Sequence, residues 1–254
     1  MNSYERNTGM VVCILGVLIV GAVLVGALAY FGPTIWGFNI TSNETVYFHF
    51  DETVGSTTGT VTLDVDITTG TVNIEFEDNA TLLYRIDVGV PNQTLQEYND
   101  PSVTFSSNTI TLDYIVLAAN ITLGSGINYT LNVETTTGSI DCDVTDGAHI
   151  GDVTLKTTTG SIDFYMVSGV NVTGSPDFIF ETSTGSIDLI MILPSEVGGS
   201  ILGSVGTGTV DIDAPGWTQE TSSYYKSSNY DSADQIVTVV AQTGTGTIDA
   251  HISN

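Results

Sequence analysis

The stretch Thr158-Thr159-Gly160-Ser161-Ile162-Asp163 decides the fold, because close copies of it recur through the second half of the chain. The other copies begin at Thr136 and Ser183, two variants contain Gly208 and Gly246, and two looser copies contain Gly59 and Gly70. From Gly138 to Gly208 the motif glycines stand 22, 25 and 23 residues apart. A regular period in the twenties indicates a stack of repeated units.

Alternating apolar and polar residues flank each motif glycine. Val153-Thr154-Leu155-Lys156-Thr157 precedes Gly160, and Ile140-Asp141-Cys142-Asp143-Val144 follows Gly138. Alternation with a period of two is typical of a strand with one buried face. Glycine between two such runs permits a backbone bend that a Cβ atom would oppose. Each unit is therefore predicted to be strand, glycine corner, strand and return loop, with the motif isoleucine facing inward.

Two all-β architectures fit this pattern. One is a β-solenoid of about 23-residue rungs, in which equivalent residues stack at a strand spacing of about 4.8 Å. The other is an antiparallel β-sandwich with hairpins at the glycines, which the 11-residue spacing of Gly59 and Gly70 favours locally. The spacing of the later copies favours the solenoid, and this is the predicted fold.

The recurrent motif resembles the repeats of the widespread family of putative adhesins of unknown function, which carry T-x-[ST]-G-x-[IV]. The resemblance is strongest over residues 131–252 and weaker over residues 54–78, whereas residues 80–130 depart from the motif. It implies a β-solenoid-like domain with a role in adhesion, and it implies no chemistry.

The N-terminal segment is almost wholly apolar from Met10 to Phe31. About 22 residues of helix reach roughly 33 Å, enough to cross a bilayer core. Arg6 precedes the segment and no cation follows it before Arg85, which predicts a cytoplasmic N-terminus and an extracellular remainder. Cleavage after Ala29 as a signal peptide, or after Gly9 as a pilin-type leader, is the alternative. The predicted parts are a cytoplasmic tail (1–9), a transmembrane helix in the cell membrane (10–31), a linker with the first strand (32–53) and a repeat ectodomain (54–254, irregular over 80–130).

The composition is strongly acidic. The 254 residues carry 29 Asp plus Glu against 4 Lys plus Arg, a formal net charge of −25. Such a chain is repelled by phosphate backbones, which excludes nucleic acid as a partner. The aspartate after each motif isoleucine would point outward, and a stacked row of carboxylates could hold Ca²⁺ weakly. The calcium candidates are Asp141, Asp163, Asp188 and Asp211, although flat strands supply few of the six to eight oxygens needed, so a solvated acidic face is preferred.

Two further groups of residues are candidate sites. Tyr224, Tyr225, Lys226 and Tyr230, in the polar and aromatic stretch 219–233, predict an exposed binding loop. Glycosylation sequons stand at Asn39, Asn43, Asn79, Asn92, Asn120, Asn128 and Asn171.

Catalytic chemistry has little basis in the sequence. His49, His149 and His251 lie far apart without metal-ligand spacing and are expected at the surface or at strand ends, while Cys142 is expected to be buried and apolar. The predicted function is a membrane-anchored extracellular structural or adhesin-like protein, not an enzyme and without a cofactor. The expected partners are the lipid bilayer through residues 10–31, and other surface proteins, glycans or another copy. A pilin-like filament subunit and a membrane-tethered envelope sensor are the alternatives.

Overall fold

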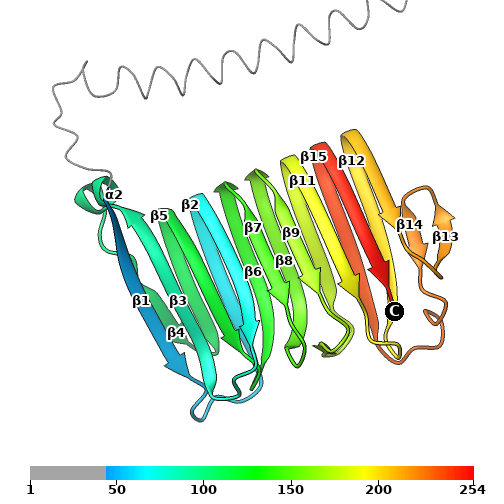
Figure 1. The fold of residues 1–254 in the computed structure, drawn as a ribbon, viewed down its shortest axis with the longest axis horizontal. Coiled ribbons are helices and arrows are strands. Elements are labelled where there is room, and N and C mark those ends of the chain that lie inside the picture. The colour runs from blue at the N-terminus through cyan, green and yellow to red at the C-terminus, as the bar shows by residue number, and fades with distance from the viewer. Residues whose placement is uncertain (1–43) are drawn as a thin grey trace, which may run out of the picture. The chain divides into compact units, whose positions relative to one another are not determined.

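The computed structural model describes residues 44–254, and these residues form an all-β fold (Figure 1). One short helix, α2 (Asn92–Glu97), interrupts the strands. The strands before the repeats are β1 (Thr45–Thr53), β2 (Thr60–Glu77), β3 (Leu82–Pro91), β4 (Val103–Ser106) and β5 (Thr109–Gly124). Those that follow are β6 (Asn128–Thr137), β7 (Ile140–Val144), β8 (His149–Thr159), β9 (Ile162–Met166), β10 (Asn171–Val172), β11 (Asp177–Ile192), β12 (Gly198–Asp213), β13 (Thr218–Thr221), β14 (Tyr224–Lys226) and β15 (Ile236–Ser253).

Six parallel strands close into a barrel. The N-terminal part of β2 pairs with β6, which pairs with β8, which pairs with the N-terminal part of β11. The C-terminal part of β11 pairs with β9, which pairs with β7, which pairs with the C-terminal part of β2. The predictions of a β-solenoid and of an antiparallel sandwich are both wrong. β2 and β11 bend at Gly70 and Gly185, so each pairs with one neighbour before its bend and with another after it. The series of parallel pairings that starts at β2 therefore ends at β2 again.

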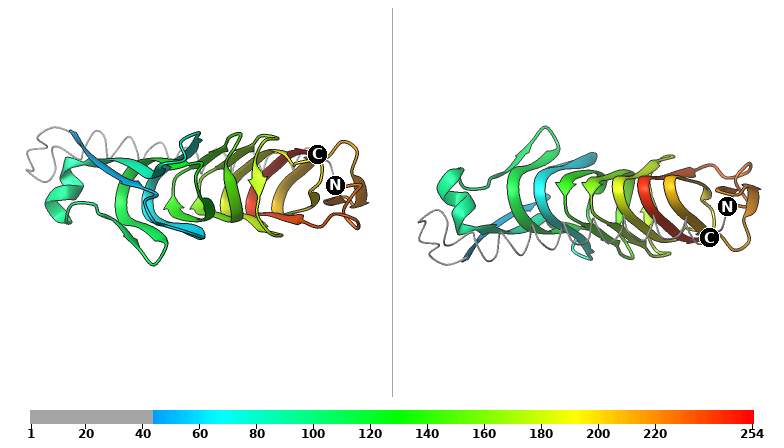
Figure 2. Two further views of the ribbon diagram at one scale, coloured as in Figure 1. Left: turned by 90° about the horizontal axis from the view of Figure 1, so that it is seen from below. Right: turned by 90° about the horizontal axis from the view of Figure 1, so that it is seen from above.

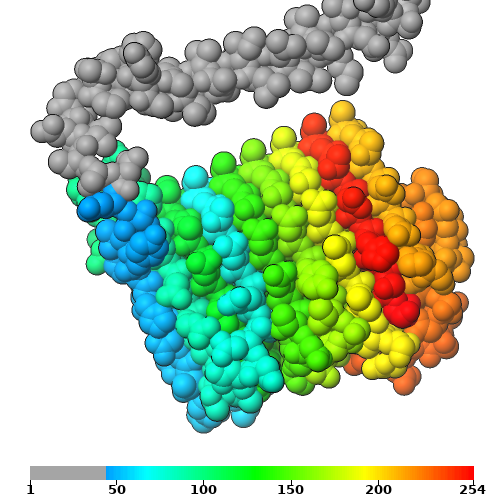
Figure 3. Space-filling model, in the orientation of Figure 1, coloured from blue at the N-terminus to red at the C-terminus, as the bar shows by residue number. Residues whose placement is uncertain are grey.

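The order of neighbours also departs from the sequence. β15 lies between β11 and β12, and β2 lies between β5 and β6, all in parallel register. Figure 3 shows the first case, with the red band of β15 between the yellow band of β11 and the gold band of β12. The prediction that 23-residue rungs stack in sequence order is therefore wrong as well, because β15 returns to pair with β11, which comes earlier in the chain.

Each repeat has two walls with the apolar core between them, and Figure 2 shows the strands bending around this core. The first wall contains the segments before the motif glycines, such as β6 and β8, and the second wall contains those after them, such as β7 and β9. Motif isoleucines Ile140, Ile162 and Ile187 are fully buried, which confirms their predicted inward orientation. The burial pattern alternates along both walls, as expected for strands with one face in the core.

The motif glycines stack directly on one another at the corner between the walls. Gly160 has a φ of +151°, and a Cβ atom there would lie 1.7 Å from the carbonyl oxygen of Gly138. The same contact joins Gly138 to Gly70 and Gly185 to Gly160. Leu117 of β5 takes the equivalent place at one end of the stack and is not a glycine. Glycine is thus required at each corner where the Cβ position would face the backbone of a neighbouring strand.

Different elements cover the two ends of the stack. At one end, β4 and β3 pair antiparallel with the two halves of β5, and β1 pairs with β3. At the other end, the β13–β14 hairpin pairs with β12. Much of the stretch 80–130, predicted to be irregular, consists of these end strands together with α2.

Within residues 44–254, no helix has the length and apolarity needed to cross a membrane. The predicted transmembrane helix at residues 10–31 lies outside the described residues, as do the signal-peptide and pilin-leader cleavage sites. We therefore correct the predicted single-pass localisation in the cell membrane, because the described chain gives it no support.

Candidate functional site

The aspartates that follow the motif isoleucines form one row on the outer surface of the second wall. Asp141, Asp163 and Asp188 are neighbours in register on β7, β9 and β11. Asp249 of β15 comes next and separates Asp188 from Asp211 of β12. We call these five residues the aspartate row. The structure thus brings all four predicted calcium candidates into one line, with Asp249 among them.

Carboxylates at one strand spacing disturb each other's protonation. The pKa of Asp163 is raised by partial burial and by its hydrogen bond and charge interaction with Asp141. The pKa of Asp188 is raised by partial burial and by the charge of Asp163. Both shifts make the protonated carboxyl more favourable than in an isolated side chain. A negative charge is therefore less favourable on Asp163 and Asp188 than on an isolated aspartate.

The aspartate row does not surround a cation. Within residues 44–254, no group of three or more His, Cys, Asp or Glu side chains is arranged to hold a metal ion. The carboxylates project in parallel from a wall of strands, whereas Ca²⁺ needs oxygens that converge from several sides. Calcium binding stays a prediction that this arrangement does not favour.

A second outward row runs beside the aspartate row, two residues further along each strand. Tyr165 of β9 and Ile190 of β11 are neighbours in it and are 40% and 47% exposed. Ile190 is next to His251 of β15, whose Nδ1 lies 2.9 Å from Oδ2 of Asp213. The second wall thus presents a small apolar patch within an acidic surface.

The outer surface of the first wall contains a groove of about 610 Å³. Its lining comes from β6, β8, β11, β15 and β12, and we call it the hydroxyl groove. The residues that line it are Glu134, Lys156, Thr157, Thr158, Glu181, Thr182, Ser183, Ser204, Gln242, Thr243 and Gly244. The groove therefore crosses five parallel strands and offers hydroxyl, amide, ammonium and carboxylate groups together.

One charged row forms the floor of the hydroxyl groove. Lys156 is in register with Glu134 on one side and with Glu181 on the other. Its Nζ atom lies 2.8 Å from Oε2 of Glu181, and both side chains are about two-fifths exposed. Gln242 and Ser204 continue the row on β15 and β12.

Sequence reasoning missed this groove, although a signal for it exists. Glu134, Lys156, Glu181, Ser204 and Gln242 each stand four residues before a motif glycine. Their side chains differ in type, so the sequence shows no recurring residue four positions before the motif glycines. Only the parallel register places them next to one another.

Buried threonines support the floor of the groove at the following position, three residues before the glycine. The hydroxyl of Thr157 donates to the carbonyl oxygen of Gly138 at 3.2 Å, and that of Thr243 donates to Gly185 at 3.4 Å. The Oγ1 atoms of Thr135 and Thr182 are buried and have no hydrogen-bond partner within the described residues. The threonines thus connect the first wall to the glycine corner of the neighbouring repeat.

The predicted binding loop covers the end of the stack. Tyr224, Tyr225 and Lys226 form β14, and all four predicted residues are half-buried. Tyr225 packs against the core, and Nζ of Lys226 lies 4.6 Å from the ring centre of Tyr230. A cation over an aromatic ring stabilises this arrangement modestly. The residues therefore serve as a cap, and ligand binding by them stays a prediction.

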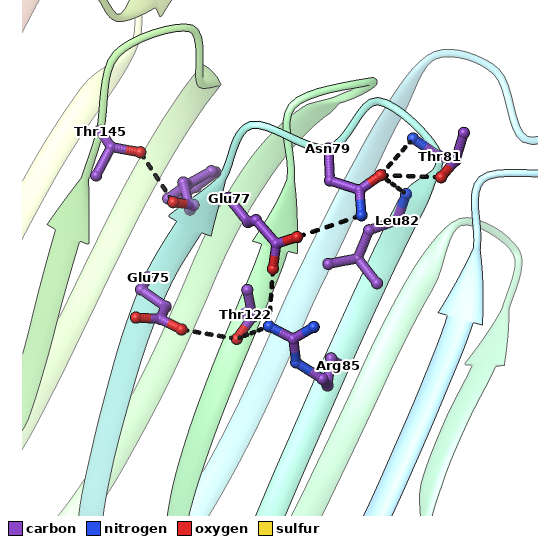
Figure 4. Close-up of polar contacts among 9 residues, drawn as sticks. Glu75, Glu77, Asn79, Thr81, Leu82, Arg85, Thr122 and Thr145 are labelled. Atoms are coloured by element: carbon purple, nitrogen blue, oxygen red, sulfur yellow. Dashed lines mark hydrogen bonds and ion pairs between the residues drawn. The ribbon is translucent and has the colours of Figure 1, made fainter.

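Among the predicted glycosylation sites, Asn79 is held in a polar network (Figure 4). Its Oδ1 accepts hydrogen bonds from the Thr81 hydroxyl and from the backbone N–H groups of Thr81 and Leu82, while its amide donates to Glu77. Arg85 donates to the same Glu77 carboxylate at 2.8 Å. This network ties together the ends of β2 and β3.

The other sequons have varied surroundings. The amide of Asn128 donates to Thr60 at 2.9 Å, and Asn120 accepts a hydrogen bond from Asn73. Asn120 and Asn171 are exposed on strands, and Asn92 is half-exposed at the start of α2. Asn39 and Asn43 lie outside the described residues. Glycosylation stays a prediction at all seven sites.

The histidines and the cysteine occupy the predicted kinds of position. His49 is exposed on β1, where a hydrogen bond to Asp87 raises its pKa, and His149 and His251 lie toward the ends of their strands. Cys142 is buried in β7, and burial raises the pKa of its thiol. Cys13 lies outside the described residues. The structure thus keeps the three histidines on separate strands.

Comparisons with known proteins show similarity of structure only. No protein-family model and no curated protein matches the chain. A crystal structure of a putative cell adhesion protein from Clostridium sporogenes matches with a TM-score of 0.66 and 16% identity, over 82% of this chain and 100% of that one. Putative adhesins from Bacteroides fragilis and Parabacteroides distasonis match with TM-scores of 0.29 and 0.27. Their identities are 9% and 8%, over 82% and 81% of this chain and 98% of each of theirs. The first similarity shows a shared fold, and the other two carry no argument at these TM-scores.

Proposed function

We propose that the protein is a non-catalytic, adhesin-like protein that binds a glycan chain in the hydroxyl groove. One observation carries the proposal: a continuous polar groove of about 610 Å³ crosses five parallel strands of the first wall. A ligand lying across the strands would meet a fresh set of polar side chains at every strand, about 4.8 Å apart. A polysaccharide, whose sugar units repeat along its length, could therefore make similar contacts at successive strands of the groove.

The chemistry of the lining supports a ligand rich in hydroxyl groups. Glu134 and Glu181 supply acceptors, Lys156 supplies donors, and the amide of Gln242 supplies both. Thr158 and Ser183 add hydroxyls along the same groove. Sugar hydroxyls both donate and accept, so they can satisfy each of these groups without burying an unpaired charge.

Membership of the adhesin family belongs to this proposal. The fold shared with the Clostridium sporogenes protein supports it, together with the repeated motif. A rigid wall of strands keeps its side chains at fixed separations, which suits simultaneous weak contacts that add up to avidity.

The non-catalytic role is likewise proposed. The groove has one cation, Lys156, and its nearest carboxylate already pairs with it at 2.8 Å. No histidine or cysteine lines the groove. Such a lining can orient a ligand through hydrogen bonds and one ion pair, which supports a binding role.

The test is retention of the full chain on immobilised polysaccharides of neutral, acidic and amino-sugar type. A Lys156→Met, Gln242→Ala double variant should bind its preferred polysaccharide at least tenfold more weakly. A Tyr165→Ala, Ile190→Ala variant on the second wall is the matched control and should bind as the parent does. Failure to bind any polysaccharide, retention only on protein-coated surfaces, or equal losses in both variants would contradict the proposal.

A further inference from the structure

Within residues 44–254, the caps at the two ends of the stack leave part of one parallel strand, β12, without a partner on its outer side. At the β5 end both walls are covered, by β4 along Thr109–Leu112 and by β3 along Ala118–Leu123. At the β12 end, β14 pairs with Ser200–Leu202 in the first wall. Among the described residues, no strand pairs with the outer side of Val210–Asp213 in the second wall. The second-wall part of β12 therefore ends the parallel ladder with an unpaired edge.

The apolar side chains behind this edge are less covered than their equivalents. Ile212 is 9% exposed, while Ala250 and Leu189, the residues in register with it on β15 and β11, are 0% and 1% exposed. Val210 is only partly buried, whereas its neighbour Ile248 is 1% exposed. An additional strand would cover both positions.

The outward side chains of the same edge are acidic. Asp211 and Asp213 are exposed and continue the two outward rows of the second wall. A strand added in the same register would place its own outward residues directly beside these two carboxylates, about 4.8 Å away. Cationic residues there would be attracted, and acidic residues would be repelled.

The same charges argue against another copy of this chain at the edge. The residues that the repeats present beside the Asp211 position are Asp141, Asp163, Asp188 and Asp249, which would extend the row of like charges. Charged side chains on an edge strand prevent that edge from pairing with a strand of another copy that carries the same charge. The edge therefore selects against self-association.

We propose that the second-wall edge of β12, Val210–Asp213, binds an extended segment of a partner protein by adding it as a further strand. The segment has apolar residues that cover Val210 and Ile212, and cationic residues that lie beside Asp211 and Asp213. Main-chain hydrogen bonds supply the pairing, and the alternate side chains supply the specificity. This interaction is separate from glycan binding in the hydroxyl groove, which lies on the other wall.

The probe is the labelled peptide acetyl-Gly-Thr-Thr-Val-Lys-Ile-Lys-Ser-amide, titrated with the full chain and followed by fluorescence anisotropy at low salt. It should bind, while the peptide with glutamate in place of both lysines should bind at least tenfold more weakly. Two further peptides carry N-methyl groups on alternate residues, in the two possible phases. Strand pairing uses every second N–H group, so one phase should retain binding and the other should lose it. Equal binding of the two phases, or no binding of the parent peptide, would overturn the proposal.

Variants of the protein locate the site. An Asp211→Asn, Asp213→Asn variant should weaken peptide binding at least tenfold. An Asp141→Asn, Asp163→Asn variant removes the same charge elsewhere on the same wall and should weaken binding less than threefold. Equal weakening by both variants would mean attraction to the whole acidic surface and would overturn the edge as the site. Polysaccharide retention should be unchanged in both variants, so the two proposals can fail separately.

Discussion

Asp163 and Asp188 lie side by side in parallel register on β9 and β11, with both side chains on the outer face of the second wall. Partial burial raises the pKa of both carboxyl groups, to which the negative charge of Asp141 adds for Asp163 and that of Asp163 adds for Asp188. Two unit charges at about 4.8 Å repel by about 0.9 kcal/mol in water before screening by salt.

Removing one charge from this pair should stabilise the protein. We expect Asp163→Asn to raise the free energy of unfolding at pH 7 by about 1 kcal/mol at low salt, because like charges directly opposite each other destabilise a sheet. Urea unfolding at pH 7 in low and high salt measures this, and the gain should shrink in high salt. Asp231→Asn, at an exposed loop residue, is the control and should have little effect. A loss of stability in Asp163→Asn would contradict the prediction.

The same pair predicts a dependence of stability on pH. Because the folded-state pKa values of Asp163 and Asp188 lie above the ordinary carboxyl value of 3.8, the folded state binds more protons than the unfolded state in this range. The contribution of these two groups is therefore most favourable below pH 3.8 and declines as the pH rises through their folded-state pKa values. Unfolding curves from pH 3.5 to pH 7 should show the advantage of Asp163→Asn over the parent growing with pH. An advantage that stays constant across this range would contradict the raised pKa values.

Glycine at the corner should be indispensable. A Cβ atom in Gly160→Ala would meet the carbonyl oxygen of Gly138 at 1.7 Å, and φ is +151°. Neither backbone can move without breaking its ladder, so we expect a loss of at least about 3 kcal/mol or failure to fold. Gly151→Ala is the control, because its Cβ would lie 3.4 Å from the nearest atom, the Thr130 hydroxyl. Thermal unfolding of both variants gives the comparison, and similar melting temperatures would contradict the stacking.

The inward isoleucines give the sharpest test of the core. Ile162→Asp should unfold the described region, because it buries an unpaired charge at a position with no exposed surface. Ile190→Asp changes the same residue types at a position that is 47% exposed, and should cost less than about 1 kcal/mol. Circular dichroism and thermal melts distinguish the two. An unchanged melting curve for Ile162→Asp would mean that the motif isoleucine does not face the core.

The buried threonines provide a matched pair. Thr157→Val removes the hydrogen bond to Gly138 and should cost about 1 kcal/mol. Thr182→Val removes a buried hydroxyl that has no partner within the described residues, so it should be neutral or slightly stabilising. Urea unfolding of the two variants tests this order. The reverse order would show that the Thr182 hydroxyl is satisfied in solution.

Part of the candidate site could be predicted from single positions. The alternation around each motif glycine correctly put Asp141, Asp163 and Asp188 outside and the isoleucines inside. The stacking of these aspartates also follows from copies that pair in register. The hydroxyl groove could not be predicted in this way, because Lys156, Glu181 and Gln242 share a position but not a residue type.

The sequence by itself determined most local features of the protein: all-β structure, a bend at the motif glycines from Gly70 onward, and the alternating burial of the residues that flank them. The looser copy at Gly59 lies in the loop between β1 and β2 and forms no such corner. The local features follow from a period of two and from the steric freedom of glycine, which depend only on nearby residues. Only the tertiary structure decided that β15 lies between β11 and β12, that six strands close into a barrel, and that the outer edge of β12 stays half covered. The physical reason is that near-identical repeats offer near-identical edges, so the choice of partner depends on long-range packing and on the return loops rather than on the motif.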